Sequence, residues 1–420
     1  MLDFQDKPHM ARSGSDTVKV IIIGGGVGGP ILALALQRAG IESEVFEARE
    51  AEAEERGSWL NFQANGMDAL RSIDAAGPLE DAGYEVDTMS FVNGKGRSLG
   101  QLPMAARRPD GLTSRMLSRD ALARGLRTLA EERGVTMHYG RKFETARLDP
   151  AGVCAVFDDG SEARGDLLVG ADGVWSKVRT LIDPHAAIPR YVPVLNTGGF
   201  IPGLTVDVPE KEFRMQFGTR CFFAWMPTPD GGTVWFANPP RRHEPERGAL
   251  EAIDDASWRA LLHELIGQDH GPAHEIIDAA PGPVEAWATY DLPTVAHWHD
   301  GGRMVLLGDA AHAVAPSAGQ GASMALEDAV TLARCLRDVP GGVSGLPVAL
   351  ARYEELRRGR TEKIVAHGHR SANDKAAGPV GRVIRDAMLP VIFRRASRDG
   401  GASMMWLQGS HVEFEERVAF

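Results

Sequence analysis

Cysteine is scarce in this sequence, and its three copies lie far apart. Cys154, Cys221 and Cys335 form no C-x-x-C pair, so we expect neither a disulfide framework nor a zinc site, and we predict no metal. This cysteine usage is typical of a reducing compartment and favours a cytoplasmic protein. Uninterrupted apolar stretches of about 18 residues are also missing, so no membrane-spanning helix is expected.

An excess of positive charge is absent as well. The 46 Lys and Arg residues are outnumbered by 57 Asp and Glu residues, which gives a formal net charge of -11. This balance argues against nucleic acid or a membrane as the main partner. Residues 1–17 are polar and contain no apolar core of a secretory signal, so we predict a disordered extension there. The 420 residues are enough for more than one domain.

A glycine-rich turn follows the first apolar run. "VKVIIIGGGVGG" places Gly24, Gly26 and Gly29 in a G-x-G-x-x-G pattern between a predicted strand and a predicted helix. In this context the first glycine permits a tight turn, the second lets the backbone approach a pyrophosphate, and the third allows close packing. Glu47 ends the next strand, about 20 residues further on, where a carboxylate would bind an adenosine ribose. The alternative for Glu47 is a solvated charge, and Arg49 nearby leaves the choice between NAD-type and NADP-type ribose open.

Two more aspartates each end an apolar strand. Asp172 in "DLLVGADG" precedes Gly173, a pattern that by itself favours a helix cap. Asp309 in "VLLGDAAHA" follows Gly308. We expect His312, three residues later, to be a packed or capping residue rather than a catalytic base.

A helix is predicted to begin near Gly319, Gln320 and Gly321. Its N-terminus would stabilise an anionic or electron-rich group. The acidic residues Glu327 and Asp328 lie near its start, and we expect the helix dipole to account for them.

The remaining chain predicts an α/β protein with an inserted sheet. Residues 213–240 are rich in aromatic and β-branched residues, which favours an antiparallel sheet placed between two parts of an α/β domain. We expect that α/β domain to comprise 18–185 and 288–372, the inserted domain to comprise 186–287 with a contribution from near 85–110, and 373–420 to be helical. The arginine-containing tail would suit a membrane surface, but we favour a packed helix, because Pro390 interrupts it and the protein is acidic.

Taken in order, the three glycine and aspartate motifs resemble those of the single-component (class A) FAD-dependent monooxygenases, the aromatic hydroxylase-like family. The resemblance covers nearly the whole folded chain and implies a Rossmann-like FAD-binding domain with an inserted antiparallel-sheet substrate domain and a C-terminal helix. It implies that the G-x-G-x-x-G loop and Glu47 bind the ADP part of FAD. Asp172 and Gly173 would serve FAD and NAD(P)H, and Gly308 and Asp309 would bind the ribityl chain.

The same resemblance assigns further contacts. Arg119 in "SRDAL" matches an arginine that contacts FAD. The loop along the isoalloxazine ring corresponds to Pro316, Gly319, Gln320, Gly321 and Ala322, whose backbone would favour the anionic reduced flavin. Aromatic residues that we expect to supply a substrate pocket are Trp59, Phe222, Phe223, Trp225 and Trp235, although strand alternation lets only some of them share a face.

The chemistry implied by the resemblance is a monooxygenation. NADH or NADPH reduces FAD, O₂ adds at the flavin C4a, and the hydroperoxide transfers one oxygen to a small, electron-rich, aromatic or polycyclic molecule by hydroxylation or epoxidation. No catalytic side chain is assigned, because the flavin drives the reaction. A flavin halogenase and an FAD-dependent dehydrogenase are the alternatives; "FFAWMP" (222–227) lacks the first tryptophan and the isoleucine of the halogenase W-x-W-x-I-P motif. The protein is expected to be a monomer or homodimer.

Overall fold

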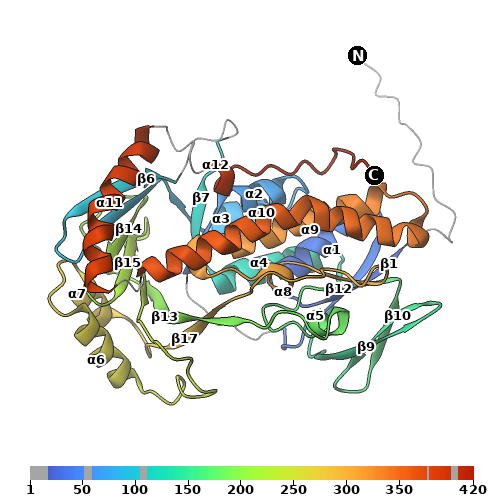
Figure 1. Cartoon of the computed structure of the whole chain (residues 1–420), viewed down its shortest axis with the longest axis horizontal. Helices are drawn as coiled ribbons and strands as arrows, with labels where there is room; N and C mark the ends of the chain where they lie inside the picture. Colours follow the sequence, from blue (N-terminus) through green and yellow to red (C-terminus); the bar gives the residue numbers. More distant parts are fainter. Residues whose placement is uncertain (1–17, 52–58, 105–110, 376–377, 399–404) are drawn as a thin grey trace.

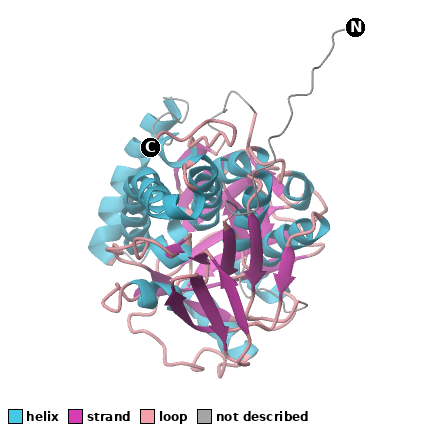
Figure 2. Cartoon of the chain, turned by 90° about the vertical axis from the view of Figure 1, so that its right-hand side faces the viewer, coloured by secondary structure: helices cyan, strands magenta, loops and turns pink. Residues whose placement is uncertain are grey.

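The computed structural model describes residues 18–51, 59–104, 111–375, 378–398 and 405–420. The predicted disordered extension, residues 1–17, lies outside these ranges. Figure 1 shows the long helices α9 and α10 running along the molecule above the strands, with α11 at one end. Figure 2 shows the helices gathered mainly above and to one side of the strands.

The glycine and aspartate motifs follow strands of a five-stranded parallel sheet. Its strand order is β18-β12-β1-β2-β8, and all four pairings are parallel. The strands are β1 (Lys19–Ile23), β2 (Glu42–Phe46), β8 (Thr136–His138), β12 (Leu167–Gly170) and β18 (Met304–Leu306). β1, β12 and β18 are buried almost throughout, as expected where helices cover both faces of a parallel sheet.

Helices pack around this sheet. Their apolar faces are buried in the main core, and α1 packs directly on α9. They are α1 (Gly28–Arg38), α2 (Ala64–Arg71), α3 (Gly77–Ala82), α4 (Arg119–Glu132), α5 (Lys177–Ile182), α8 (Asp309–His312), α9 (Gly321–Asp338) and α10 (Leu346–Lys375). Short 3-10 turns, η1 (Pro316–Ala318) and η2 (Gly342–Gly345), precede α9 and α10.

A seven-stranded sheet forms the second part of the molecule. Its order is β17-β13-β16-β15-β14-β5-β6, antiparallel except for the pairing of β14 with β5. The strands are β5 (Thr88–Asn93), β6 (Ser98–Pro103), β13 (Arg190–Ile201), β14 (Glu212–Phe217), β15 (Phe222–Pro227), β16 (Thr233–Asn238) and β17 (Ala286–Asp291). Helices α6 (Asp255–Ile266) and α7 (Ala273–Ala279) cover one face of this sheet.

Two small antiparallel sheets complete the fold. One contains β9 (Phe143–Asp149), β10 (Gly152–Phe157) and β11 (Glu162–Gly165), with a turn at Asp159 and Gly160 between the last two strands. The other contains β3 (Trp59–Phe62), β4 (Tyr84–Val86) and β7 (Ser114–Ser118). The C-terminal part holds α11 (Pro379–Arg398) and α12 (Met405–Gln408).

The predicted fold class is confirmed: a parallel α/β unit carries an inserted, largely antiparallel sheet. Strands β5 and β6, from within residues 85–110, join the inserted sheet. The division into domains at the stated boundaries stays a prediction. Among the described helices, none is both long and apolar enough to cross a bilayer.

Candidate functional site

The glycine loop after β1 is tight at its ends and open in its middle. A Cβ on Gly24, which has φ +110°, would lie 2.3 Å from the carbonyl oxygen of Ala171. A Cβ on Gly29 would lie 2.0 Å from the carbonyl oxygen of Gly24. A Cβ on Gly26 would meet nothing within 4 Å. The open space beside Gly26 is where a dinucleotide pyrophosphate requires close access to the backbone.

Glu47 faces this loop from the end of β2. Its side chain is buried, and Oε2 accepts a hydrogen bond from the Gly25 amide at 2.6 Å while Oε1 accepts one from the Arg49 amide at 3.0 Å. The alternative of a solvated charge is therefore wrong. A carboxylate offers about four acceptor positions, and the Arg49 guanidinium also lies 3.4 Å from Oε1, so at least one position remains for a ribose hydroxyl.

Asp172 ends β12 beside the same loop. Its Oδ2 accepts hydrogen bonds from the amides of Lys177 at 2.8 Å and Val178 at 3.2 Å, in the first turn of α5. Ser176 is the N-cap residue of that helix. The helix-cap interpretation thus explains one carboxylate oxygen. Oδ1 is buried without a hydrogen-bond partner among the described residues, and burial raises the pKa of this carboxyl group.

Arg179 connects the segments that follow the two strand-end aspartates, a role that the sequence did not predict. Its buried guanidinium donates to the carbonyl oxygens of Val174 at 2.8 Å and Ala310 at 2.9 Å. Ala310 follows Asp309 in α8, so Arg179 holds the loop after Asp172 against the turn that carries Asp309. The arginine ends the motif "ADGVWSKVR", which was the available signal.

Asp309 begins α8 and lies against the start of α9. Gly308 precedes it with φ +62°, a conformation that suits glycine. Asp309 Oδ1 is 3.7 Å from the position of a Cβ on Gly321. The predicted packing of His312 is confirmed: it is 3% exposed, and its Nε2 lies 2.6 Å from Asp328 Oδ2.

Glu327 and Asp328 belong to a buried ion cluster, so the helix-dipole explanation for them was wrong. Both side chains are almost fully buried, and Arg357 from α10 lies 2.6 Å from a carboxylate oxygen of each. Arg360 also bonds Glu327, at 2.9 Å. Burial alone would raise the pKa of Asp328, but His312 and Arg357 lower it to about 2. Asp328 is therefore ionised and fixes α8, α9 and α10 to one another.

The N-terminal turn of α9 and strand β3 hold polar side-chain atoms that lack a hydrogen-bond partner in the described part of the chain. Gly319 adopts the left-handed conformation with φ +60°. Gln320 points inward, where its Oε1 accepts from Asn65 Nδ2 at 2.9 Å. Ser323 Oγ in the first turn of α9 and both polar atoms of the Asn61 side chain on β3 are buried without a hydrogen-bond partner among the described residues. These atoms, with the first-turn amides of α9, form a polar surface suited to a ligand.

Trp59 and Arg119 occupy neighbouring strand ends. Trp59 on β3 pairs with Ser118, the residue before Arg119. Trp59 stacks on Tyr84 with ring centroids 5.7 Å apart, and it also contacts Phe200. Arg119 is exposed at the start of α4.

The aromatic residues of β15 and β16 divide between two faces, which corrects the predicted substrate pocket. Phe223, Trp225 and Trp235 pack in the core under α6 and α7. Phe222 points to the opposite face, together with Phe236. The first three residues therefore stabilise the sheet from behind and do not line a pocket on the face that carries Phe222.

Polar side chains lie on this second face, next to the loop before α9. Asn238 donates to Asn196 Oδ1, and Asn196 Nδ2 donates to Thr289 Oγ1 at 3.0 Å. A small cavity separates these three residues from Pro316 and Ser317; Val192, Val194 and Ala315 complete its lining. None of the described residues that line this cavity is charged.

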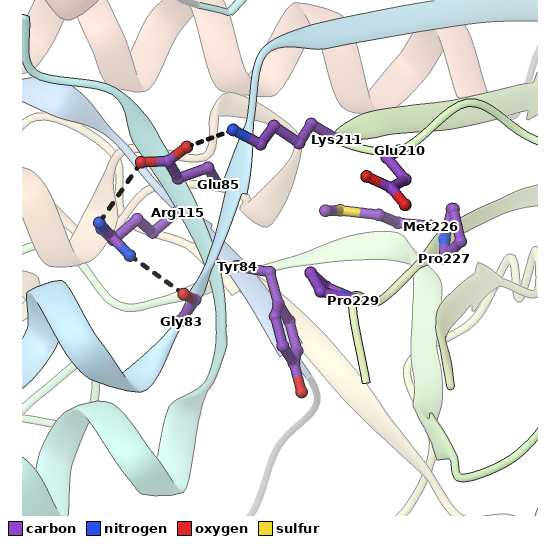
Figure 3. A pocket seen from close by; sticks show the side chains of 9 residues that line it. All are labelled: Gly83, Tyr84, Glu85, Arg115, Glu210, Lys211, Met226, Pro227 and Pro229. Carbon is purple, nitrogen blue, oxygen red and sulfur yellow. Dashed lines mark hydrogen bonds and ion pairs between the residues drawn. The ribbon is translucent and has the colours of Figure 1, made fainter. Parts of the chain in front are cut away.

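A larger pocket, of about 220 Å³, opens beside Tyr84 (Figure 3). Lys211 and Arg115 both point to the carboxylate of Glu85, at 2.7 Å and 3.7 Å, so this one carboxylate is shared by two cations. The Tyr84 hydroxyl points away from them and donates to Asp230. Burial is the larger cause and the hydrogen bond to Asp230 the smaller one, and together they raise the pKa of Tyr84 to about 12. No residue predicted to contact a cofactor lines this pocket.

Residues 17–367 match the family model described as FAD binding domain. The chain belongs to this family. It is 33% identical over 353 residues to the aurachin C monooxygenase/isomerase of Stigmatella aurantiaca. The match covers 84% of this chain and 88% of the relative. It is 29% identical over 364 residues to the 3-amino-4-hydroxybenzoate 2-monooxygenase of Streptomyces cremeus, with coverages of 85% and 87%.

The fold has solved counterparts. Klebsiella pneumoniae HpxO complexed with FAD and uric acid superposes with a TM-score of 0.82 at 24% identity, over 93% of this chain and 97% of that chain. The family member described here is an FAD-dependent monooxygenase, as the sequence predicted, and FAD is its cofactor. The open loop at Gly26, the placement of Glu47 and the unpartnered oxygen of Asp172 fit this group.

Proposed function

We propose that the chain uses FAD, reduced by NADH or NADPH, to insert one oxygen atom from O₂ into an uncharged, electron-rich aromatic molecule. The observation that carries this proposal is the approach of Asp309 to Gly321 at the α9 N-terminus, just after the loop residues Pro316 and Ser317 that line the uncharged cavity. Hydroxylation and epoxidation are both compatible with it.

Bound FAD would supply the redox chemistry, in which NAD(P)H, O₂ and a proton yield NAD(P)⁺, water and the oxygenated substrate. The protein holds the cofactor at both ends. Glu47 accepts hydrogen bonds from ribose hydroxyls, and the amides after Gly26 bind phosphate at the start of α1. Asp309 accepts hydrogen bonds from the ribityl chain.

The start of α9 has an electrostatic function in this proposal. Its first-turn amides, at Gly321, Ala322 and Ser323, point out of the helix N-terminus and would stabilise negative charge on a reduced flavin ring bound there. No acid–base side chain is needed for this effect. The hydrogen-bonded side chains of His312 and Asp328 hold the turn that carries Asp309 in position.

The residues that line the small cavity favour an uncharged substrate, for which this cavity of about 10 Å³ would have to open. Asn196, Asn238, Thr289 and Ser317 offer neutral hydrogen-bonding groups beside the apolar residues Val192, Val194 and Ala315. Arg190 lies nearby on β13, but Asp291 binds its guanidinium with two hydrogen bonds of 2.9 and 3.0 Å. A carboxylate would lose its hydration here without gaining a cation, whereas a phenol, lactam or carbonyl group would be satisfied.

The test is a turnover assay in labelled oxygen. NADH or NADPH oxidation is measured with a neutral hydroxylated aromatic heterocycle and with the same ring carrying a carboxylate, and peroxide release reports uncoupling. We expect the neutral compound to gain one labelled oxygen atom. A product oxidised without the label would indicate a dehydrogenase, and halide-dependent product a halogenase; faster turnover of the carboxylate would disprove the substrate assignment.

A further inference from the structure

Helix α11 carries its apolar side chains on the outside. The chain exposes few large hydrophobic side chains, and half of those in the described residues lie on this one helix. They recur every three or four residues and so form one stripe: Val380, Val383, Ile384, Met388, Val391 and Ile392, each at least 50% exposed.

The inward face of α11 is held by specific contacts. Phe393 stacks on Phe91 of β5 with ring centroids 4.3 Å apart. The Arg385 guanidinium lies 4.6 Å from the Phe217 ring centroid and pairs with Asp386, which also accepts from Asn93 at 3.0 Å. These contacts fix the rotation of the helix, so the outward stripe follows from the packing. The sequence favoured a packed helix; only one face of it is packed.

Positive charge continues the stripe at its C-terminal end. Arg394, Arg395 and Arg398 are exposed and follow Val391 at the same helical spacing. α11 contains five arginines and one aspartate, a net charge of +4, in a chain whose net charge is -11. Exposed apolar residues and arginines are therefore concentrated on the same helix face.

We propose that this face of α11, the stripe with Arg394, Arg395 and Arg398, docks on an anionic membrane surface. Aliphatic side chains enter the region between headgroups and acyl chains, and arginines bind the lipid phosphates. A second copy of the chain fits less well. Two stripes related by a two-fold axis would bring these arginines near the partner helix without a free carboxylate, because Asp386 is already paired with Arg385 and Asn93.

The position of α11 gives this docking a consequence for the enzyme. The helix packs along β6 at the edge of the seven-stranded sheet, and Figure 1 shows it at the end of the molecule that holds β14 and β15. Docking would place the β6 edge of this sheet beside the bilayer, with β16 and β13, which carry Asn238 and Asn196, four and five strands further in. This consequence rests on the proposed function: an apolar, uncharged substrate would be concentrated at the bilayer.

The experiment is vesicle co-sedimentation of the FAD-loaded full chain. The vesicles contain phosphatidylcholine alone or with roughly one third phosphatidylglycerol. We expect binding to the anionic vesicles and little binding to the neutral ones. Ile384→Ser combined with Val391→Ser should weaken binding by about tenfold or more, because apolar burial is lost. Replacing Arg394, Arg395 and Arg398 with glutamine should weaken it similarly.

Matched controls change exposed residues elsewhere. Ile188→Ser with Leu148→Ser removes comparable exposed apolar area, and glutamine at Arg124, Arg242 and Arg247 removes the same charge; both should bind like the original chain. No vesicle binding, or equal binding by test and control variants, would overturn the proposal. So would a concentration-dependent dimer that Ile384→Ser with Val391→Ser dissolves in the absence of vesicle binding. Vesicle binding is independent of turnover, so it fails or succeeds separately from the proposed reaction.

Discussion

The backbone amide of Gly308 donates a hydrogen bond to Asp328 Oδ2 at 3.0 Å. Asp328 lies on α9 and Gly308 directly precedes Asp309, so the bond joins the helix predicted to face the cofactor to the turn that carries a predicted ribityl contact. The same oxygen lies 2.6 Å from His312 Nε2, and Arg357 binds the other oxygen. The backbone geometry of the site thus depends on one fully buried carboxylate.

Replacing this carboxylate should loosen the site. In Asp328→Asn the side chain loses its charge and one acceptor oxygen, and Arg357 is left with Glu327 alone. We expect the free energy of unfolding to fall by about 3 kcal/mol and FAD to be retained less well. Thermal unfolding and the flavin-to-protein absorbance ratio measure both effects. Glu355→Gln, at an exposed position of α10, is the control; equal behaviour of the two variants would contradict this account.

The same group predicts acid sensitivity. The pKa of Asp328 is about 2 in the folded protein, against an ordinary value of 3.8. The unfolded chain therefore binds more protons than the folded chain between these values, and the stabilisation that Asp328 contributes is present above about pH 4 and lost as the pH falls toward about 2. Its contribution is about 2 kcal/mol. Urea unfolding across this range should show a shallower acid dependence in Asp328→Asn, and an unchanged slope would refute the assignment.

Two glycines of the first motif should respond differently to alanine. A methyl group on Gly29 meets the Gly24 carbonyl at 2.0 Å, so Gly29→Ala should destabilise the apoprotein. Gly26 has open space and no positive φ, so Gly26→Ala should leave the melting temperature of the apoprotein unchanged and weaken FAD binding by about tenfold or more. FAD titration by fluorescence quenching tests this, with Gly77→Ala, also in open space, as the control. Normal FAD affinity in Gly26→Ala would exclude the predicted pyrophosphate position.

Local patterns explain what the sequence could predict here. Gly24 and Gly29 follow from a strand–turn–helix pattern within a few residues, and strand alternation predicted that β15 and β16 would be two-sided. Which side Trp225 faces could not be predicted, because that depends on where α6 and α7 pack. The partners of Asp328 were missed because Arg357 lies 29 residues further along the chain. That Gly24 and Gly29 contact FAD stays a prediction.

Asp309→Ala tests the second aspartate motif. Asp309 is ionisable, only partly buried and close to Gly321, so its removal should leave the fold intact and take away acceptors for ribityl hydroxyls. We expect the purified variant to contain less FAD and to need added FAD for activity. Asp207→Ala, in an exposed loop, should retain flavin. Unchanged flavin content in Asp309→Ala would rule out the ribityl assignment.

Asn238 should determine substrate affinity rather than cofactor binding. In Asn238→Leu the wall of the cavity loses a hydrogen-bonding group, and Asn196 Oδ1 loses its donor. Because each lost hydrogen bond to a buried neutral group costs about 1–3 kcal/mol, we expect KM for the neutral substrate to rise by about tenfold or more, with flavin content unchanged. Steady-state kinetics combined with the absorbance ratio separates these effects. Phe223→Leu, behind the sheet, is the comparison: it should lower stability and leave KM unchanged, since Phe223 contacts the α6 and α7 core. A KM change in Phe223→Leu but not in Asn238→Leu would place the substrate on the opposite face of the sheet.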